Sequence, residues 1–256
     1  MFPRSLAAGS SGLRGLRSLW PIAALLLVWQ LATLAGLVAP NLLPSPSTIA
    51  GRLFEQLHST EFLFNIGQTL VRLFAGFGLA LAAGVLLGLV MALGGEFLLA
   101  PMVRLLSPIP KIALYPALVL LLGFGHASKI GLVVSEAVFP IMLATFHGVR
   151  SVQPKLVWSA RAAGAGRLAV VFTVLLPSAF GSILTGCRIG LVVACINVFL
   201  AEMISSTDGL GHLLVMAARS YQVVDMFVPL VLISTIGLCL NSSLQYVRRR
   251  HASAGG

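Results

Sequence analysis

The stretch VWSARAAGAGRLAVVFTVLLPS, from Val157 to Ser178, decides how this chain is organised. It combines arginines with a cluster of small residues, and it lies between two long apolar segments. Small residues at 159–165 predict a short helix with little side-chain bulk, which a groove on a partner could hold closely. Gly164 or Gly166 can end this helix, because glycine readily adopts the left-handed conformation at a helix C-terminus. The alternative is a plain connecting loop whose arginines only fix the membrane topology.

The composition excludes a water-soluble protein. The chain has 256 residues, of which 58% are hydrophobic and only 9% are charged, whereas soluble domains average about 25% charged residues. We therefore expect an all-α polytopic membrane protein, since a membrane-spanning helix needs about 20 mostly apolar residues.

Apolar segments predict six transmembrane helices within 20–246, at about 20–39, 69–93, 101–122, 130–147, 180–200 and 226–246. The first run is longer than the apolar core of a signal peptide, which favours an uncleaved span. Pro108, Pro110 and Pro116 predict that the third span is kinked or split. Before the second span, Ile49, Leu53 and Leu57 recur every four residues and predict a short interfacial helix. Ser47 is the expected cap of this helix.

Charged residues predict the orientation. The net charge is +10, from 17 basic and 7 acidic residues. The basic residues stand at the ends of apolar runs instead of forming a stripe, which argues against nucleic acid as a partner. With the N-terminus inside, eleven of them lie in inner segments and four in outer ones; the outer four are Arg52, Arg72, Lys129 and Arg219. The positive-inside rule then places the segment 1–19, the loop 150–167 and the tail 247–256 in the cytoplasm.

Four segments carry a family resemblance. The spacing of Ala160, Gly164 and Pro177 resembles the cytoplasmic "EAA" loop of ABC-transporter permeases. LLPSPS at 42–47, SPIPKIALYPALVLLLGFG at 107–125 and AEMISSTDGLG at 201–211 resemble one branch of the binding-protein-dependent importers. That branch takes up sulfonates, taurine, nitrate and some vitamin precursors. The resemblance implies a type I importer permease with MetI-like architecture in the inner membrane of a prokaryote.

The resemblance also implies partners and coupling residues. A separate ATPase dimer would bind ATP and contact this loop, so the chain itself would need no cofactor. The coupling residues would be Trp158, Ser159, Ala160, Arg161, Ala163, Gly164, Ala165 and Pro177. Trp158 stands where the family's motif has its leading glutamate. A second permease copy would complete the pathway as a homodimer, and a periplasmic or lipid-anchored solute-binding protein would deliver the solute near 44–61 and 202–225.

Polar residues within the spans are candidates for the solute pathway, because ionisable groups in a membrane are usually functional. The candidates are Glu136, Arg188, Asn197 and Glu202. Arg188 could pair with Glu136 or face an anionic solute, and we favour a structural or gating role. Glu202, at the outer end of the fifth span, is expected to be an interfacial charge in water.

No catalytic arrangement or metal site is expected. The sequence has no GxxxxGK[ST] phosphate loop, no HExxH and no GxSxG. Cys187, Cys195 and Cys239 fall singly in apolar segments and indicate buried small residues instead of metal ligands. The chain is therefore expected to be no enzyme. The competing interpretation is a proton-coupled secondary carrier that uses Glu136 as a relay, although we find none of the inverted repeats that would favour it.

Overall fold

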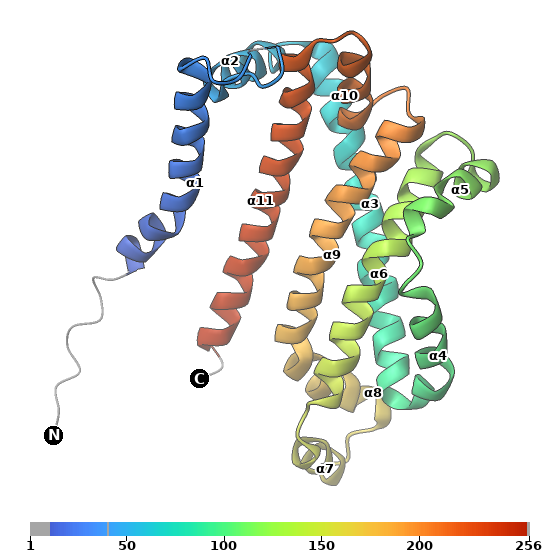
Figure 1. Ribbon diagram of the computed structural model, residues 1–256. Coiled ribbons are helices and arrows are strands. Elements are labelled where there is room, and N and C mark those ends of the chain that lie inside the picture. Colours follow the sequence, from blue (N-terminus) through green and yellow to red (C-terminus); the bar gives the residue numbers. More distant parts are fainter. Residues whose placement is uncertain (1–10, 40, 255–256) are drawn as a thin grey trace, which may run out of the picture.

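The computed structural model describes residues 11–39 and 41–254, and the secondary structure of this part of the chain is helical (Figure 1). In chain order the elements are α1 (Ser11–Leu34), α2 (Pro46–Gln56), α3 (Thr60–Val90), η1 (Met91–Gly95), α4 (Glu96–Leu106), η2 (Lys111–Leu114), α5 (Tyr115–Leu122), α6 (His126–Arg150), α7 (Pro154–Ala162), α8 (Arg167–Val170), η3 (Val171–Leu175), α9 (Leu176–Ser205), α10 (Leu210–Arg219) and α11 (Val223–Ala254).

Four segments of the described chain are long and apolar enough to cross a membrane. They are Thr60–Leu106, His126–Arg150, Arg167–Ser205 and Val223–Arg248. The first of them contains a break, because Gly94 has a φ of 132° inside η1 and the ribbon turns back there (Figure 1). α3 and α4 are therefore separate helices joined by a turn.

The predicted third span, 101–122, is split in the structure. α4 ends at Leu106, Pro110 is extended, and the chain resumes as η2 and then α5, which has Pro116 in its first turn. Proline has no backbone N–H, so a continuous helix cannot pass through 108–110 at low cost. The backbone N–H of Lys111, next to the break, donates to the Glu136 carboxylate at 3.2 Å, which satisfies it inside the protein as a membrane requires.

Element ends differ in places from those predicted. α3 begins at Thr60 instead of about 69, and α11 continues to Ala254 through most of the expected tail. The interfacial helix is present as α2, but its cap is Ser45 instead of Ser47: the Ser45 hydroxyl accepts from the Thr48 N–H at 3.2 Å. Part of the expected N-terminal segment, 1–10, lies outside the described residues.

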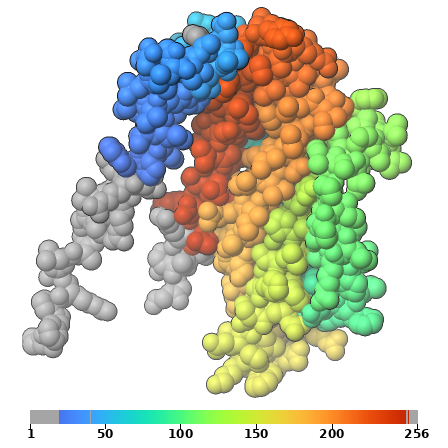
Figure 2. Space-filling model, in the orientation of Figure 1, coloured from blue at the N-terminus to red at the C-terminus, as the bar shows by residue number. Residues whose placement is uncertain are grey.

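The core consists of α3, α6 and α9, which pack closely through glycines. A Cβ built on Gly84 of α3 would lie 2.8 Å from Ile141 of α6, and one on Gly88 would lie 2.5 Å from the Met142 carbonyl oxygen. Such glycines let the backbones of neighbouring membrane helices approach closely. This core separates two ends of the molecule, which we call the α7 end and the α10 end. Figure 2 shows α7 projecting from the first of them.

Candidate functional site

At the α7 end, a glycine stops a short exposed helix. Gly164 has a φ of +86°, its N–H donates to the Arg161 carbonyl at 2.9 Å, and the next N–H, of Ala165, donates to the Ala160 carbonyl at 3.0 Å. This is the glycine-terminated turn that the sequence predicted. Of the two candidate glycines, Gly164 ends α7, whereas Gly166 precedes α8.

α7 has one packed face and one open face. Val157, Ala160 and Ala165 contact the buried cluster that includes Val170 and Leu175. The remaining predicted coupling residues are exposed; they are Trp158, Ser159, Arg161, Ala163, Gly164 and Pro177. Trp158 is 66% exposed. An exposed tryptophan and an exposed arginine on one short helix form a surface suited to a protein partner.

The predicted pathway residues do not converge on one site. Glu136 forms an ion pair with Lys111 at 3.6 Å, while Arg188 donates from Nε to Asn241 of α11 at 3.1 Å. Of the two alternatives for Arg188, the pair with Glu136 is therefore not formed, and Arg188 instead joins α9 to α11. Asn197 is buried and donates to the Val193 carbonyl of its own helix at 2.9 Å.

Glu202 is not an interfacial charge in water, which corrects the sequence-based expectation. It is 1% exposed and accepts from Arg72 at 2.7 Å, from the Thr69 hydroxyl at 2.8 Å and from the Gly211 N–H at 3.1 Å. Arg72 is 2% exposed and also pairs with Asp208. Both side chains are buried where α3, the end of α9 and the start of α10 meet.

Three polar residues of α3 hold the loop between α9 and α10. Besides the Arg72 contacts, the Asn65 side-chain oxygen accepts from the Gly209 N–H at 2.6 Å, and the Thr69 hydroxyl accepts from the Leu210 N–H at 2.9 Å. Gly209 has a φ of +98°, and a Cβ there would lie 2.4 Å from the Glu202 carboxyl carbon. We call Asn65, Thr69, Arg72, Glu202 and Asp208 the Arg72 cluster. The AEMISSTDGLG segment at 201–211 therefore forms a loop that is held by buried hydrogen bonds to α3 and to Glu202.

The sequence contained a signal for this cluster that our reasoning missed. Asn65, Thr69 and Arg72 follow one another by four and three residues within an apolar helix. That spacing places them on one face, and a polar stripe in a membrane helix faces protein or a cavity.

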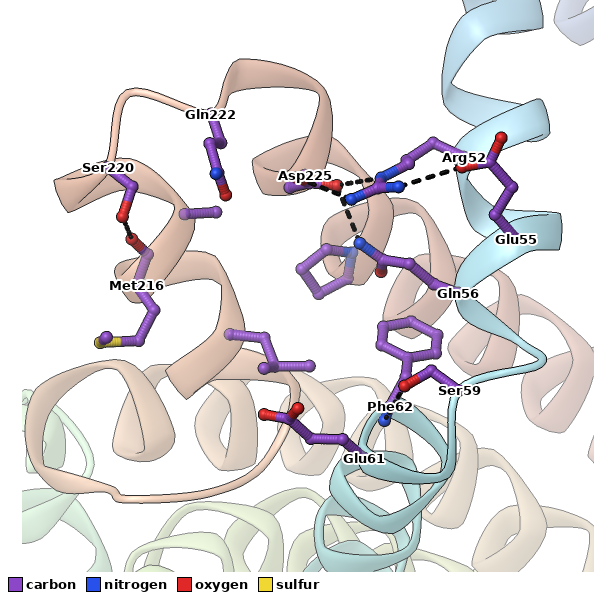
Figure 3. A pocket seen from close by; sticks show the side chains of 13 residues that line it. Arg52, Glu55, Gln56, Ser59, Glu61, Phe62, Met216, Ser220, Gln222 and Asp225 are labelled. Atoms are coloured by element: carbon purple, nitrogen blue, oxygen red, sulfur yellow. Dashed lines mark hydrogen bonds and ion pairs between the residues drawn. The ribbon is translucent and has the colours of Figure 1, made fainter.

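A pocket of about 450 Å³ opens at the α10 end, between α2, α10 and α11 (Figure 3). Arg52 donates to Asp225 at 2.6 Å and to Glu55 at 3.0 Å, and Gln56 donates to Asp225 at 2.8 Å. The hydrogen bond that Arg52 donates to Asp225, followed by the one that it donates to Glu55, raises the pKa of Arg52 above its usual value. The carboxylate of Glu61 stands apart from this group (Figure 3). The pocket is lined by three carboxylates, those of Glu55, Glu61 and Asp225, and by one arginine, and we call it the acidic pocket.

These features define a polytopic helical membrane protein with a projecting helix at one end and a polar, pocketed face at the other. A family model described as "Binding-protein-dependent transport system inner membrane component" matches residues 80–253, and the chain belongs to that family.

Individual relatives agree with this assignment. The chain is 29% identical to the putative aliphatic sulfonates transport permease protein SsuC of Bacillus subtilis, over 89% of this chain and 83% of that protein. It is 31% identical to the taurine transport system permease protein TauC of Escherichia coli, over 91% and 87% of the two chains. An inward-facing structure of the MetNI methionine ABC transporter superimposes with a TM-score of 0.67 at 18% identity, covering 75% of this chain and 97% of that one. At this identity the last comparison shows the fold alone.

Family membership decides between the functional alternatives. The chain is the permease component of an ABC importer with a MetI-like fold, and it is neither a secondary carrier nor the ATPase. The expected architecture and transport function are thereby confirmed.

Proposed function

We propose that this permease carries a small organic anion across the prokaryotic inner membrane, driven by ATP that a separate subunit hydrolyses. The observation that carries the proposal is α7, an exposed helix with small residues, Trp158 and Arg161 on its open face. The names of the sulfonate and taurine permeases among its relatives support an anion of that kind as the solute.

The structure supports the α7 end as the cytoplasmic end. Two of the four basic residues counted as outer, Arg72 and Lys129, are buried. Arg52 and Arg219 are then the outer basic residues that remain at the surface, whereas Lys155, Arg161 and Arg167 are exposed at the α7 end, a bias that favours this end as the cytoplasmic one.

In this orientation α7 docks onto the ATPase dimer. Ser159 and Ala163 leave room for close approach, Arg161 offers donors to carboxylates or carbonyls, and Trp158 contributes a large rigid contact. Trp158 thus replaces the charge of the family's glutamate with apolar contact area. A second permease copy completes the pathway.

At the other end, the acidic pocket receives the solute-binding protein. It is formed by α2, the start of α3, α10 and the start of α11, which are the segments expected to face that partner. Its excess of carboxylates favours a partner that presents lysine or arginine there, since complementary charge sets register and association rate.

The experiment is uptake of taurine and ethanesulfonate into vesicles that contain the permease, its ATPase and its binding protein. Uptake should require ATP, and uptake that follows a proton gradient without ATP would refute the importer. Gly164→Leu should abolish coupled transport and weaken ATPase binding, because an L-residue is strained at a φ of +86°.

Gly166→Leu provides the matched control. Gly166 is equally exposed, and its φ of −70° suits any residue. The complex with the Gly166→Leu variant should therefore transport the solute faster than the complex with Gly164→Leu. If the Gly164→Leu complex binds the ATPase and transports as the unmodified complex does, α7 is not the docking helix.

A further inference from the structure

A second pocket lies on the other side of α10 and has a volume of about 300 Å³, within the range of small-molecule sites. One wall is the face of α10 that carries His212, Val215 and Arg219. The facing walls are the end of α9 with the loop to Thr207, and Phe124 from the α5–α6 loop. Met216 lines both this pocket and the acidic pocket, so α10 separates the two.

The charge of this pocket is positive. Arg219 and His212 lie seven residues apart on one face of α10, and neither forms an ion pair in the described part of the chain. Glu202 and Asp208, which flank the wall residues 203–207 in the chain, are both bonded to Arg72. Lys129, buried close to this pair, adds a second cation that interacts with both carboxylates. Arg72 and Lys129 therefore match these two carboxylates, and the charge of Arg219 is left for a ligand.

The walls are held in place by buried polar contacts. The α10 side begins at Leu210, whose N–H is bonded to Thr69 at 2.9 Å. The Ser205 hydroxyl is bonded to that of Tyr115 at 2.9 Å. The carbonyl of Phe124 accepts from Lys129 at 2.6 Å, which fixes the backbone of this exposed aromatic residue. A site whose supporting residues are fixed in this way binds without a large ordering cost.

The pocket combines a polar side with an apolar side. Thr207, His212 and Arg219 supply donors, whereas Phe124, Ile204 and Val215 supply apolar surface. We propose that this pocket is a binding subsite for a small organic anion that carries a short apolar group, with Arg219 as the residue that contacts the anionic head. The inference rests on the proposed import function and adds where on the permease the solute first binds. The acidic pocket on the other side of α10 would repel the same anion, because carboxylates outnumber basic residues there.

The test is direct binding to the full-length permease in nanodiscs of neutral lipid, measured by equilibrium dialysis with radiolabelled 1-butanesulfonate. Arg219→Gln should weaken binding about 10- to 100-fold, the range for one charge-assisted contact. Arg219→Lys keeps the charge and should retain most of the affinity. Arg104→Gln removes an exposed arginine from α4 that does not line the pocket, and should bind as the unmodified chain does.

Competing probes test the chemical class. Butanesulfonate should bind more tightly than inorganic sulfate, which lacks the apolar group, and than 1-butanol, which lacks the charge. Equal affinity of the Arg219→Gln and unmodified chains, no saturable butanesulfonate binding, or equal affinity for sulfate would each overturn the proposal.

Uptake by the complete complex separates this proposal from the import function. If ATP-driven uptake occurs while Arg219→Gln leaves butanesulfonate binding unchanged, the pocket assignment fails and the importer stands. If butanesulfonate binds as expected but no ATP-driven uptake occurs, the import function fails and the binding pocket stands. Elution of each variant as a single species in size-exclusion chromatography verifies that it is folded.

Discussion

Replacing Arg72 with methionine should destabilise the α10 end more than a surface substitution could. The Arg72 side chain is 3% exposed and that of Glu202 is fully buried. Methionine keeps the apolar length of the side chain but removes the guanidinium, so Glu202 and Asp208 both lose their ion pair with Arg72, and Lys129 is the cation that still interacts with them. The change therefore isolates the charge from the packing.

The magnitude follows from burial. Removing one partner of a buried ion pair costs about 3–5 kcal/mol, because the remaining charge is uncompensated. Glu202 retains the Thr69 hydroxyl and the Gly211 N–H as donors, and Asp208 is 29% exposed and stays hydrated. Adding Glu202→Gln removes the unpaired charge. The double variant should then be more stable than Arg72→Met alone, with a coupling energy of about 0.5–3 kcal/mol.

Two measurements test this. Unfolding in mixed detergent micelles, followed by tryptophan fluorescence, reports the global loss and the coupling energy of the double variant. Hydrogen exchange reports the local effect: the amides of Gly209, Leu210 and Gly211 donate to the Arg72 cluster and should exchange faster in Arg72→Met. A variant with unchanged unfolding, or a double variant whose two effects simply add, would refute the assigned role of the pair.

Two further predictions concern packing and docking. Gly88→Ala should destabilise the protein by about 1–3 kcal/mol through overpacking, since its Cβ would lie 2.5 Å from the Met142 carbonyl. Gly78→Ala on the same helix meets nothing within 4 Å and should unfold like the unmodified protein; equal unfolding of both alanine variants would contradict the close α3–α6 packing. Glu61→Lys should slow association with the solute-binding protein about tenfold at low salt, as followed by surface plasmon resonance. The difference should shrink at high salt because of screening, and an unchanged association rate at low salt would exclude this docking surface.

The parts of the structure that the sequence predicted correctly follow from local rules. Gly164 ends α7 because a glycine after a run of small residues is a standard helix stop. The prolines near 110 split the third span because they lack the backbone N–H that a helix needs. The cap of α2 also had a local signal that we read wrongly. Proline is favoured at the first helical position, so Pro46 selects Ser45 as the cap.

The Arg72 cluster could not be derived in the same way. Arg72 and Glu202 stand 130 residues apart in the chain, and no local rule pairs them. The hydropathy of their surroundings places each near the end of a span, which favoured water as the environment of Glu202. Only the packing of α10 against α3 removes that water. The same holds for Arg188, whose partner on α11 depends on how α9 is rotated about its axis.

The position of α7 in the chain predicts how a movement at the α7 end is transmitted to the α10 end. α7 lies in the connection between α6 and α9, so a force applied to it acts on both helices at once. Those helices are in close contact through glycines: a Cβ on Gly186 would lie 2.8 Å from the Pro140 carbonyl, and one on Gly190 would lie 3.1 Å from the Ala137 carbonyl. Surfaces packed this tightly resist sliding, so we expect α6 and α9 to move as a single body. Because Glu202 lies in the last turn of α9, a displacement of α7 also moves the Arg72 cluster and, through it, the shared α10 wall of both pockets.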